Sequence, residues 1–254
     1  MNRYYGQSVA AQGNVVAVGS FRDNHVSSSA GAVFIYANSS ANIWDLQSIL
    51  TPGDIASNDE FGNSVSLSGN LLLAGSPGDD VEGAAYIFAN TSGNTWAEQA
   101  KLEPSDGISQ DSFGTTVILS GNNAVIGAIN HDALASNAGT AYLFTRSSPT
   151  VWVEQEKFLA GDSDIDNKFG TSIGMSGNLL AIGTPFESTG GTGAGAVYTF
   201  DITDLDHAPV ISPSPTIDFT FDEGQSSLSI NSSNISVNDL DNDDVTWSVI
   251  EHPS

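Results

Sequence analysis

The segment FGNSVSLSGNLLLAG, residues 61–75, is one of four related segments in a chain of 254 residues. Each segment starts with an aromatic residue followed by Gly, continues with a Gly-Asn pair, and closes an apolar run with a third Gly. The aromatic residues are Tyr5, Phe61, Phe113 and Phe169, which lie 56, 52 and 56 residues apart. The other glycines keep the same steps, at Gly13, Gly69, Gly121 and Gly177 and at Gly19, Gly75, Gly127 and Gly183. A period in this range indicates an array of structural repeats.

Each repeat has the side-chain pattern of four short antiparallel strands. In the second repeat, alternating or continuously apolar segments lie at residues 61–68, 71–74, 84–88 and 96–102. Gly69-Asn70 suits a hairpin turn between the first two segments, and residues 90–94 suit a turn between the last two. The sequence therefore predicts an all-β fold with four antiparallel strands in each repeat.

Four-stranded units at this spacing are typical of β-propeller blades. A single sheet with two apolar faces cannot cover itself, so we expect the blades to stack face to face. We place the blades at about residues 4–60, 61–112, 113–168 and 169–202. The fourth repeat has no Trp-containing strand after Phe200, so either the repeats are part of a larger ring or one blade is short.

Aromatic residues recur at positions that suit packing between blades. We expect the repeated pairs to fill the space between neighbouring sheets: Phe34/Tyr36, Tyr86/Phe88, Tyr142/Phe144 and Tyr198/Phe200. We assign the same packing role, rather than a sugar-stacking role, to Trp44, Trp96 and Trp152. Phe61, Phe113 and Phe169 should be buried, and the Gly after each should approach another backbone closely.

The loop between the second and third predicted strands varies in length and carries acidic residues. Its bounding glycines are 8 residues apart at Gly75–Gly83 and 12 apart in the other three repeats. These loops should all emerge on one face of a propeller, and variable loops on a rigid frame are a common place for binding. Their acidic residues are Asp23, Asp79, Asp80, Asp132 and Glu187.

A second set of acidic and amide residues precedes each Phe-Gly pair. Asp54, Asp106 and Asp162 lie 7 residues before the Phe, and Asp59, Asp111 and Asn167 lie 2 residues before it. Asp and Asn side chains accept hydrogen bonds from nearby backbone in turns, which is one interpretation. The other interpretation is a metal-binding role, because carboxylates are the ligands that hard cations prefer.

The composition disfavours several classes of function. The chain has 30 acidic and 6 basic residues, a formal net charge of −24, so nucleic acid and anionic lipid surfaces are poor partners. The acidity fits solubility in a salty medium, cation binding, or both. No Cys is present, which excludes a disulfide and a Cys nucleophile. The sequence contains no run of 18 apolar residues, so it predicts no membrane-spanning helix. No catalytic constellation stands out, so we expect a protein that is not an enzyme.

The repeats resemble the FG-GAP repeats of the integrin α-subunit propeller, and especially a bacterial version of them. The matching segments include FGNSVSLSGNLLLAGSPGDD (61–80), GAAYIF (83–88), FGTSIGMSGNLLAIGTP (169–185) and GAVYTF (195–200). The resemblance covers about residues 4–202 and implies a propeller that serves in adhesion or interaction. Many integrin-type repeats hold Ca²⁺ in a loop between strands one and two. Here tight turns such as Gly69-Asn70 occupy that place, so we do not carry that site over.

The sequence changes character after the repeats. Residues 203–216 contain three prolines and form a predicted linker, and residues 217–254 resemble the first half of a cadherin-like β-sandwich module. In that family an early Glu and an Asp-x-Asp motif bind calcium, and the matching residues here are Glu223, Asp239 and Asp241. An acidic turn is the alternative interpretation of this cluster.

Together these features predict a non-catalytic adhesion or interaction scaffold, extracellular or on the cell surface of a bacterium. Its ligand would be a protein or a carbohydrate bound on a propeller face. The alternatives are an accessory part of a secreted polysaccharide-degrading enzyme, or a structural spacer without a ligand. The first repeat begins within a few residues of Met1, so we expect the sequence to be a fragment of a longer protein.

Overall fold

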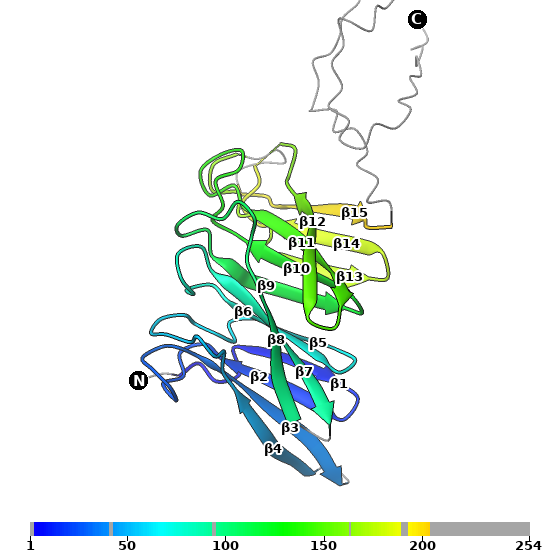
Figure 1. Cartoon of the computed structure of the whole chain (residues 1–254). Helices are drawn as coiled ribbons and strands as arrows, with labels where there is room; N and C mark the ends of the chain where they lie inside the picture. The colour runs from blue at the N-terminus through cyan, green and yellow to red at the C-terminus, as the bar shows by residue number, and fades with distance from the viewer. Residues whose placement is uncertain (1–2, 41–42, 93–94, 163, 189–192, 204–254) are drawn as a thin grey trace, which may run out of the picture. The chain divides into compact units, whose positions relative to one another are not determined.

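The computed structural model describes residues 3–40, 43–92, 95–162, 164–188 and 193–203. Every regular element in these ranges is a β-strand, and the strands form four antiparallel sheets (Figure 1). The first sheet contains β1 (Ser8–Gln12), β2 (Val15–Ser20), β3 (Ala32–Ser40) and β4 (Ile43–Leu50). The second contains β5 (Val65–Ser68), β6 (Leu71–Ser76), β7 (Ala84–Ser92) and β8 (Thr95–Leu102). The third contains β9 (Phe113–Ser120), β10 (Asn123–Ala128), β11 (Thr140–Ser148) and β12 (Val151–Phe158), and the fourth β13 (Ser172–Ser176), β14 (Leu179–Thr184) and β15 (Ala196–Asp201).

The strand order confirms the predicted blade topology. In each sheet the strands lie side by side in chain order, and every pairing is antiparallel. The predicted turn between the first two strands is present in all four sheets, where its Gly has a positive φ: Gly13, Gly69, Gly121 and Gly177. The sheets follow one another in chain order from β1–β4 to β13–β15 (Figure 1). The described repeats belong to one compact unit, Met1–Ile202.

The third strand of each complete sheet is longer than its apolar segment. In the second sheet β7 continues to Ser92, so the turn predicted at residues 90–94 starts too early. The extension forms because Asn90 pairs with Trp96 in the ladder and its N–H donates to the Asn70 carbonyl at 2.8 Å. The side chains of this extension face water, so the ladder continues without an apolar pattern in the sequence.

Apolar side chains fill the space between neighbouring sheets. Val33 and Ile35 of the first sheet pack in one cluster with Tyr86 and Phe88 of the second. Leu73 and Ile87, on the opposite face of the second sheet, pack with Tyr142 and Phe144 of the third. The predicted role of the aromatic pairs is therefore confirmed for the inner sheets, where these four side chains are at most 4% exposed.

The tryptophans only partly follow the prediction. Trp96 and Trp152 pack against the two cores from the outer strands β8 and β12. Trp44 is 42% exposed, so its predicted packing role is wrong for this chain. The reason is its position, because Trp96 packs toward the preceding sheet and the described residues place no sheet before the first one.

Residues 204–254 lie outside the described residues. This range includes most of the predicted linker, the predicted cadherin-like segment, and the predicted calcium ligands Glu223, Asp239 and Asp241. Among the described residues, no helix is long and apolar enough to cross a membrane.

Candidate functional site

The loops between the second and third strands and the connectors between sheets lie at one end of the sheets (Figure 1). We call this surface the loop face. Its segments are the described residues of 21–31, 51–60, 77–83, 103–112, 129–139, 159–168 and 185–195. The prediction that the variable loops share a face is confirmed, because antiparallel strands in chain order return the chain to the same end.

One position in each variable loop is buried, although three of the four residues there are acidic. The residues are Asp23, Asp79, His131 and Glu187, each at most 5% exposed. The carbonyl of each accepts the N–H of the Gly that immediately precedes the next strand, at 2.9–3.0 Å. Asp23, Asp79 and Glu187 are among the loop residues predicted to be available for binding, and their burial contradicts that prediction, whereas the other two, Asp80 and Asp132, are exposed.

In the second sheet the ammonium group of Lys101 contacts three carboxylates. Lys101 Nζ donates to Asp79 Oδ1 at 2.9 Å, Asp80 Oδ2 at 2.7 Å and Asp54 Oδ2 at 3.1 Å. The Tyr86 hydroxyl donates to Asp54 Oδ1 at 3.0 Å and also to Asp79. The ammonium group therefore lies where three carboxylates from two loops converge, and it neutralises part of their repulsion.

The third sheet repeats this cluster with a different residue in the loop. Tyr142 donates to Asp106 Oδ1 at 2.7 Å, and Lys157 Nζ donates to Asp106 Oδ2 at 2.5 Å. His131 takes the place of Asp79, with its Nε2 3.6 Å from Asp106 and 3.8 Å from Asp111. In the fourth sheet Tyr198 also donates to Asp162, so the Tyr–Asp contact recurs three times.

The environment shifts the pKa values of these carboxyl groups in opposite directions. Burial raises the pKa of Asp54, but hydrogen bonds from Lys101 and Tyr86 outweigh it and leave the pKa below 3.8. The pKa of Asp106 is lowered in the same way, with hydrogen bonds from its lysine and tyrosine outweighing burial. Burial dominates at Asp79 and raises its pKa above the ordinary value. The carboxylate nearer to water is thus held ionised, and the buried one resists ionisation.

Within the second acidic set, Asp59 and Asp111 organise turns, whereas Asp54, Asp106 and Asp162 accept from the Tyr and Lys side chains described above. Asp59 Oδ2 accepts the Ala56 N–H at 2.5 Å, and Asp111 Oδ2 accepts the Ile108 N–H at 2.7 Å. The turn interpretation of these residues is therefore supported. Within the described part of the chain, no group of three or more His, Asp or Glu residues is arranged to hold a metal ion.

The exposed side chains of the loop face are aliphatic as well as acidic. Large apolar residues that are more than half exposed come from six of its segments: Val26, Val81, Ile108, Leu134, Ile165 and Phe186. Sequence reasoning missed them, because isolated apolar residues in polar loops have no periodicity. It also missed the Lys–Tyr–Asp clusters, although Lys101 and Lys157 repeat with the 56-residue step and could have indicated them.

The aromatic-glycine pairs join each sheet to the one before it. Phe61, Phe113 and Phe169 are fully buried, as predicted. The Phe61 N–H donates to the Ala30 carbonyl, in the loop between β2 and β3 of the preceding sheet, at 2.9 Å. A Cβ atom on Gly75 would lie 1.9 Å from the Gly114 carbonyl oxygen, so only Gly allows this approach.

Comparison with known families matches the chain to the FG-GAP repeat. The match covers residues 1–36, 44–88, 96–144 and 152–200, which together are more than half of the chain. No curated protein matches the chain. The matched segments are those that form the four described sheets and carry the aromatic-glycine pairs. The chain therefore belongs to the FG-GAP repeat family.

Proposed function

We propose that the chain is a non-catalytic interaction scaffold of a bacterial surface or secreted protein, and that its loop face binds a protein. The observation that carries this proposal is the set of exposed apolar side chains on the loop face. They come from separate loops, and acidic residues such as Asp80 and Asp132 lie among them. Isolated exposed apolar residues are ordinary, but six on one face supply the anchors that a protein interface uses.

The same side chains favour a protein over a carbohydrate. Five of the six are aliphatic, and sugars bind best to flat aromatic faces with polar groups around them. Trp44, the exposed Trp among the described residues, lies on the outer strand β4 and not on the loop face. The net charge of −24 favours a partner surface that combines apolar with basic side chains, and association should weaken as salt increases.

A selection experiment tests this proposal. A library of random peptides displayed on phage is selected against the full chain, and the same chain is probed on a glycan array. We expect the selected peptides to be rich in Lys, Arg and apolar residues. Changing Leu134 and Ile165 to Ser should weaken their binding at least tenfold, whereas the same changes at Val151 and Val153, exposed on β12, should not. Glycan binding without peptide selection, or equal loss from both variants, would contradict the proposal.

We also propose that residues 217–254 are a cadherin-like segment in which Glu223, Asp239 and Asp241 bind calcium. The resemblance of this segment and the spacing of its carboxylates support the proposal. Calorimetric titration of the full chain with CaCl₂ should show weak binding, with a Kd of about 10⁻⁴–10⁻³ M as in extracellular modules. The double variant Asp239→Asn/Asp241→Asn should lose this heat. Equal heats from both proteins would contradict calcium binding and favour the alternative interpretation, in which these residues form an acidic turn.

A further inference from the structure

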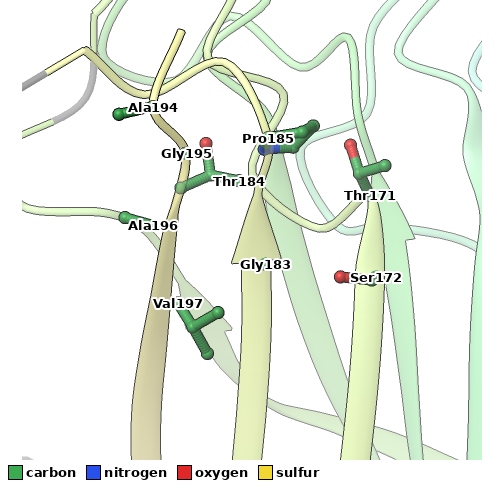
Figure 2. A pocket seen from close by; sticks show the side chains of 9 residues that line it. All are labelled: Thr171, Ser172, Gly183, Thr184, Pro185, Ala194, Gly195, Ala196 and Val197. Carbon is green, nitrogen blue, oxygen red and sulfur yellow. The ribbon is translucent and has the colours of Figure 1, made fainter. Parts of the chain in front are cut away.

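The fourth sheet has a hollow of about 560 Å³ at its loop end. Figure 2 shows the hollow between the ends of β13, β14 and β15, with Ser172, Gly183, Gly195 and Val197 among its lining residues. These residues are the fourth copies of positions that also occur in the first three sheets. In each sheet, one Gly lies near the end of the second strand and another lies immediately before the third strand. We call the surface around these two glycines the glycine seat, and in the fourth sheet they are Gly183 and Gly195.

In the first three sheets the glycine seat is filled by the aromatic-glycine pair of the next repeat. Cβ atoms on Gly19, Gly75 and Gly127 would lie 1.9–2.5 Å from the carbonyl oxygen of that pair's Gly. Cβ atoms on Gly31, Gly83 and Gly139 would lie 2.1–2.3 Å from the carbonyl oxygen of its Phe. At Gly183 the nearest atom is Ser172 Oγ of the same sheet, and at Gly195 it is the Pro185 carbonyl oxygen at 3.2 Å.

The surface beside the fourth seat is exposed where its equivalents are buried. Val197 is 68% exposed, whereas its equivalents Val33, Ala85 and Ala141 are fully buried. Ala194 is also exposed, whereas Ala30 and Ala138 are at most 1% exposed. The fourth sheet therefore leaves uncovered an apolar surface that is buried at the equivalent place in the other three sheets.

The polar groups of the seat are also in place. In the first sheet Ser8 Oγ donates to the Gly62 carbonyl at 2.8 Å, and in the third Thr116 Oγ1 donates to the Gly170 carbonyl. Ser172 holds the same position in the fourth sheet. The Ala138 carbonyl accepts the Phe169 N–H at 2.8 Å, and Ala194 is the next residue in that series. The fourth seat therefore repeats the donor and acceptor positions that hold an aromatic-glycine pair elsewhere.

The chain also has an aromatic-glycine pair without a seat, at Tyr5-Gly6. Gly6 has a φ of +86°, within the range of +82° to +94° at Gly62, Gly114 and Gly170. Its N–H donates to the Gly19 carbonyl at 3.0 Å, as the Gly62 N–H does to Gly75 at 2.9 Å. Tyr5 is nevertheless 53% exposed and contacts Phe34 and Tyr36 of its own sheet. The pair has the conformation of the buried ones but no sheet in front of it among the described residues.

Seats and pairs are equal in number, and the unmatched ones lie at opposite ends. The chain has four aromatic-glycine pairs, and residues 201–254 contain none. Three pairs fill three seats, which leaves Tyr5-Gly6 beside the first sheet and Gly183 and Gly195 in the fourth (Figure 1). We propose that Tyr5-Gly6 of a second copy of this chain occupies the fourth glycine seat.

Such a contact is head-to-tail, because it joins two different surfaces of the same protein. A contact of this type closes into a ring if the rotation allows, and otherwise grows into an open chain. Two copies would bring eight sheets together, which is within the range of 4 to 8 blades found in propellers.

Sedimentation measurements test the proposal with one variant for each side of the contact. Tyr5→Ala removes the aromatic-glycine pair, and Val197→Asp places a charge beside the seat. We expect the mass of the wild-type chain to rise above 26.4 kDa between about 1 μM and about 1 mM, and each variant alone to remain at 26.4 kDa. Val151→Asp, an equal change at a 48% exposed site on β12, should associate like the wild type.

Mixing the two variants gives the decisive result. The Val197→Asp chain keeps the aromatic-glycine pair and the Tyr5→Ala chain keeps the seat, so an equimolar mixture should form a species of twice the monomer mass. A wild-type chain that remains monomeric throughout would overturn the proposal. So would variants that associate like the wild type, or a mixture that shows no heterodimer.

Discussion

The joints between sheets and the two ends of the array contain the same residues in different surroundings. Phe113 is fully buried, whereas its equivalent Tyr5 is 53% exposed. Ala85 and Val197 hold equivalent places on their sheets, and only Ala85 is covered. The difference shows that burial here belongs to the contact between neighbours rather than to the repeat itself, as in other repeat proteins whose stability depends on nearest-neighbour contacts.

We expect the largest difference in the free energy of unfolding when the aromatic residue of a buried pair and that of the exposed first pair are each changed to Ala. Phe113→Ala should lower the free energy of unfolding by roughly 3–5 kcal/mol, because it leaves a cavity among packed side chains. Tyr5→Ala should cost less than about 1 kcal/mol in the monomer, because the ring is half in water. Urea denaturation of both variants at low protein concentration measures the contrast. Losses of similar size would show that the first pair is as well packed as the inner ones.

Substitutions in a filled and in an empty glycine seat should differ less in their effect on the free energy of unfolding. Gly75→Ala places a Cβ 1.9 Å from the Gly114 carbonyl oxygen, a backbone atom that cannot turn aside. We expect a cost of roughly 1–3 kcal/mol from this overpacking. Gly183→Ala meets the Ser172 hydroxyl instead, a side chain that can rotate, so the cost should be less. Thermal unfolding of the two variants would settle the order, and a larger loss at Gly183 would contradict the assignment of an empty seat.

The smallest effect concerns the Lys–Tyr–Asp cluster of the third sheet. The pKa of Asp106 is below its ordinary 3.8 in the folded protein, so its stabilising contribution is present above pH 3.8 and lost as the pH falls through the folded pKa. Asp106→Asn should therefore cost about 1 kcal/mol at pH 7, a modest value because the side chain is 47% exposed, and less at pH 2.5. Urea midpoints at both pH values measure this.

Asp132→Asn is the matched control for this measurement. Asp132 lies on the loop face and accepts the Asn137 N–H at 2.7 Å through a side-chain oxygen that Asn retains. Its substitution should change the midpoint little at either pH. An Asp106→Asn penalty that is the same at pH 7 and pH 2.5 would mean that the contact with Lys157 does not depend on the carboxylate charge.

The repeat period accounts for most of what the sequence could predict of the fold. Gly and aromatic residues at fixed steps indicate backbone contacts that few other residues allow, so the four sheets and the buried Phe61 follow from them. The length of β7 does not, because its last residues are polar and are held by backbone hydrogen bonds. Trp44 was misjudged because its burial depends on a neighbouring sheet and not on its own repeat.

The site was harder to predict for a related reason. Asp79 and Asp80 are adjacent acidic residues in one loop, yet Asp79 is 4% exposed and the Asp80 side chain 65%. The backbone conformation of the loop decides which of the two side chains is buried, and a single sequence does not indicate that conformation. Lys101 meets Asp54 across 47 residues because the connector returns the chain to the same end of the sheets. Such a contact has no local pattern.

Hydrogen exchange at four equivalent amides tests most directly that aromatic-glycine pairs join the sheets. The measurement uses the Val197→Asp chain, which keeps the protein monomeric if the proposed contact is correct. The N–H groups of Phe61, Phe113 and Phe169 donate at 2.8–2.9 Å to carbonyls in the loop that precedes the third strand of the preceding sheet. We predict that they exchange on the order of 100-fold or more slowly than the N–H of Tyr5, which has no preceding sheet among the described residues. Equal protection of all four amides, or fast exchange at Phe113, would contradict the account.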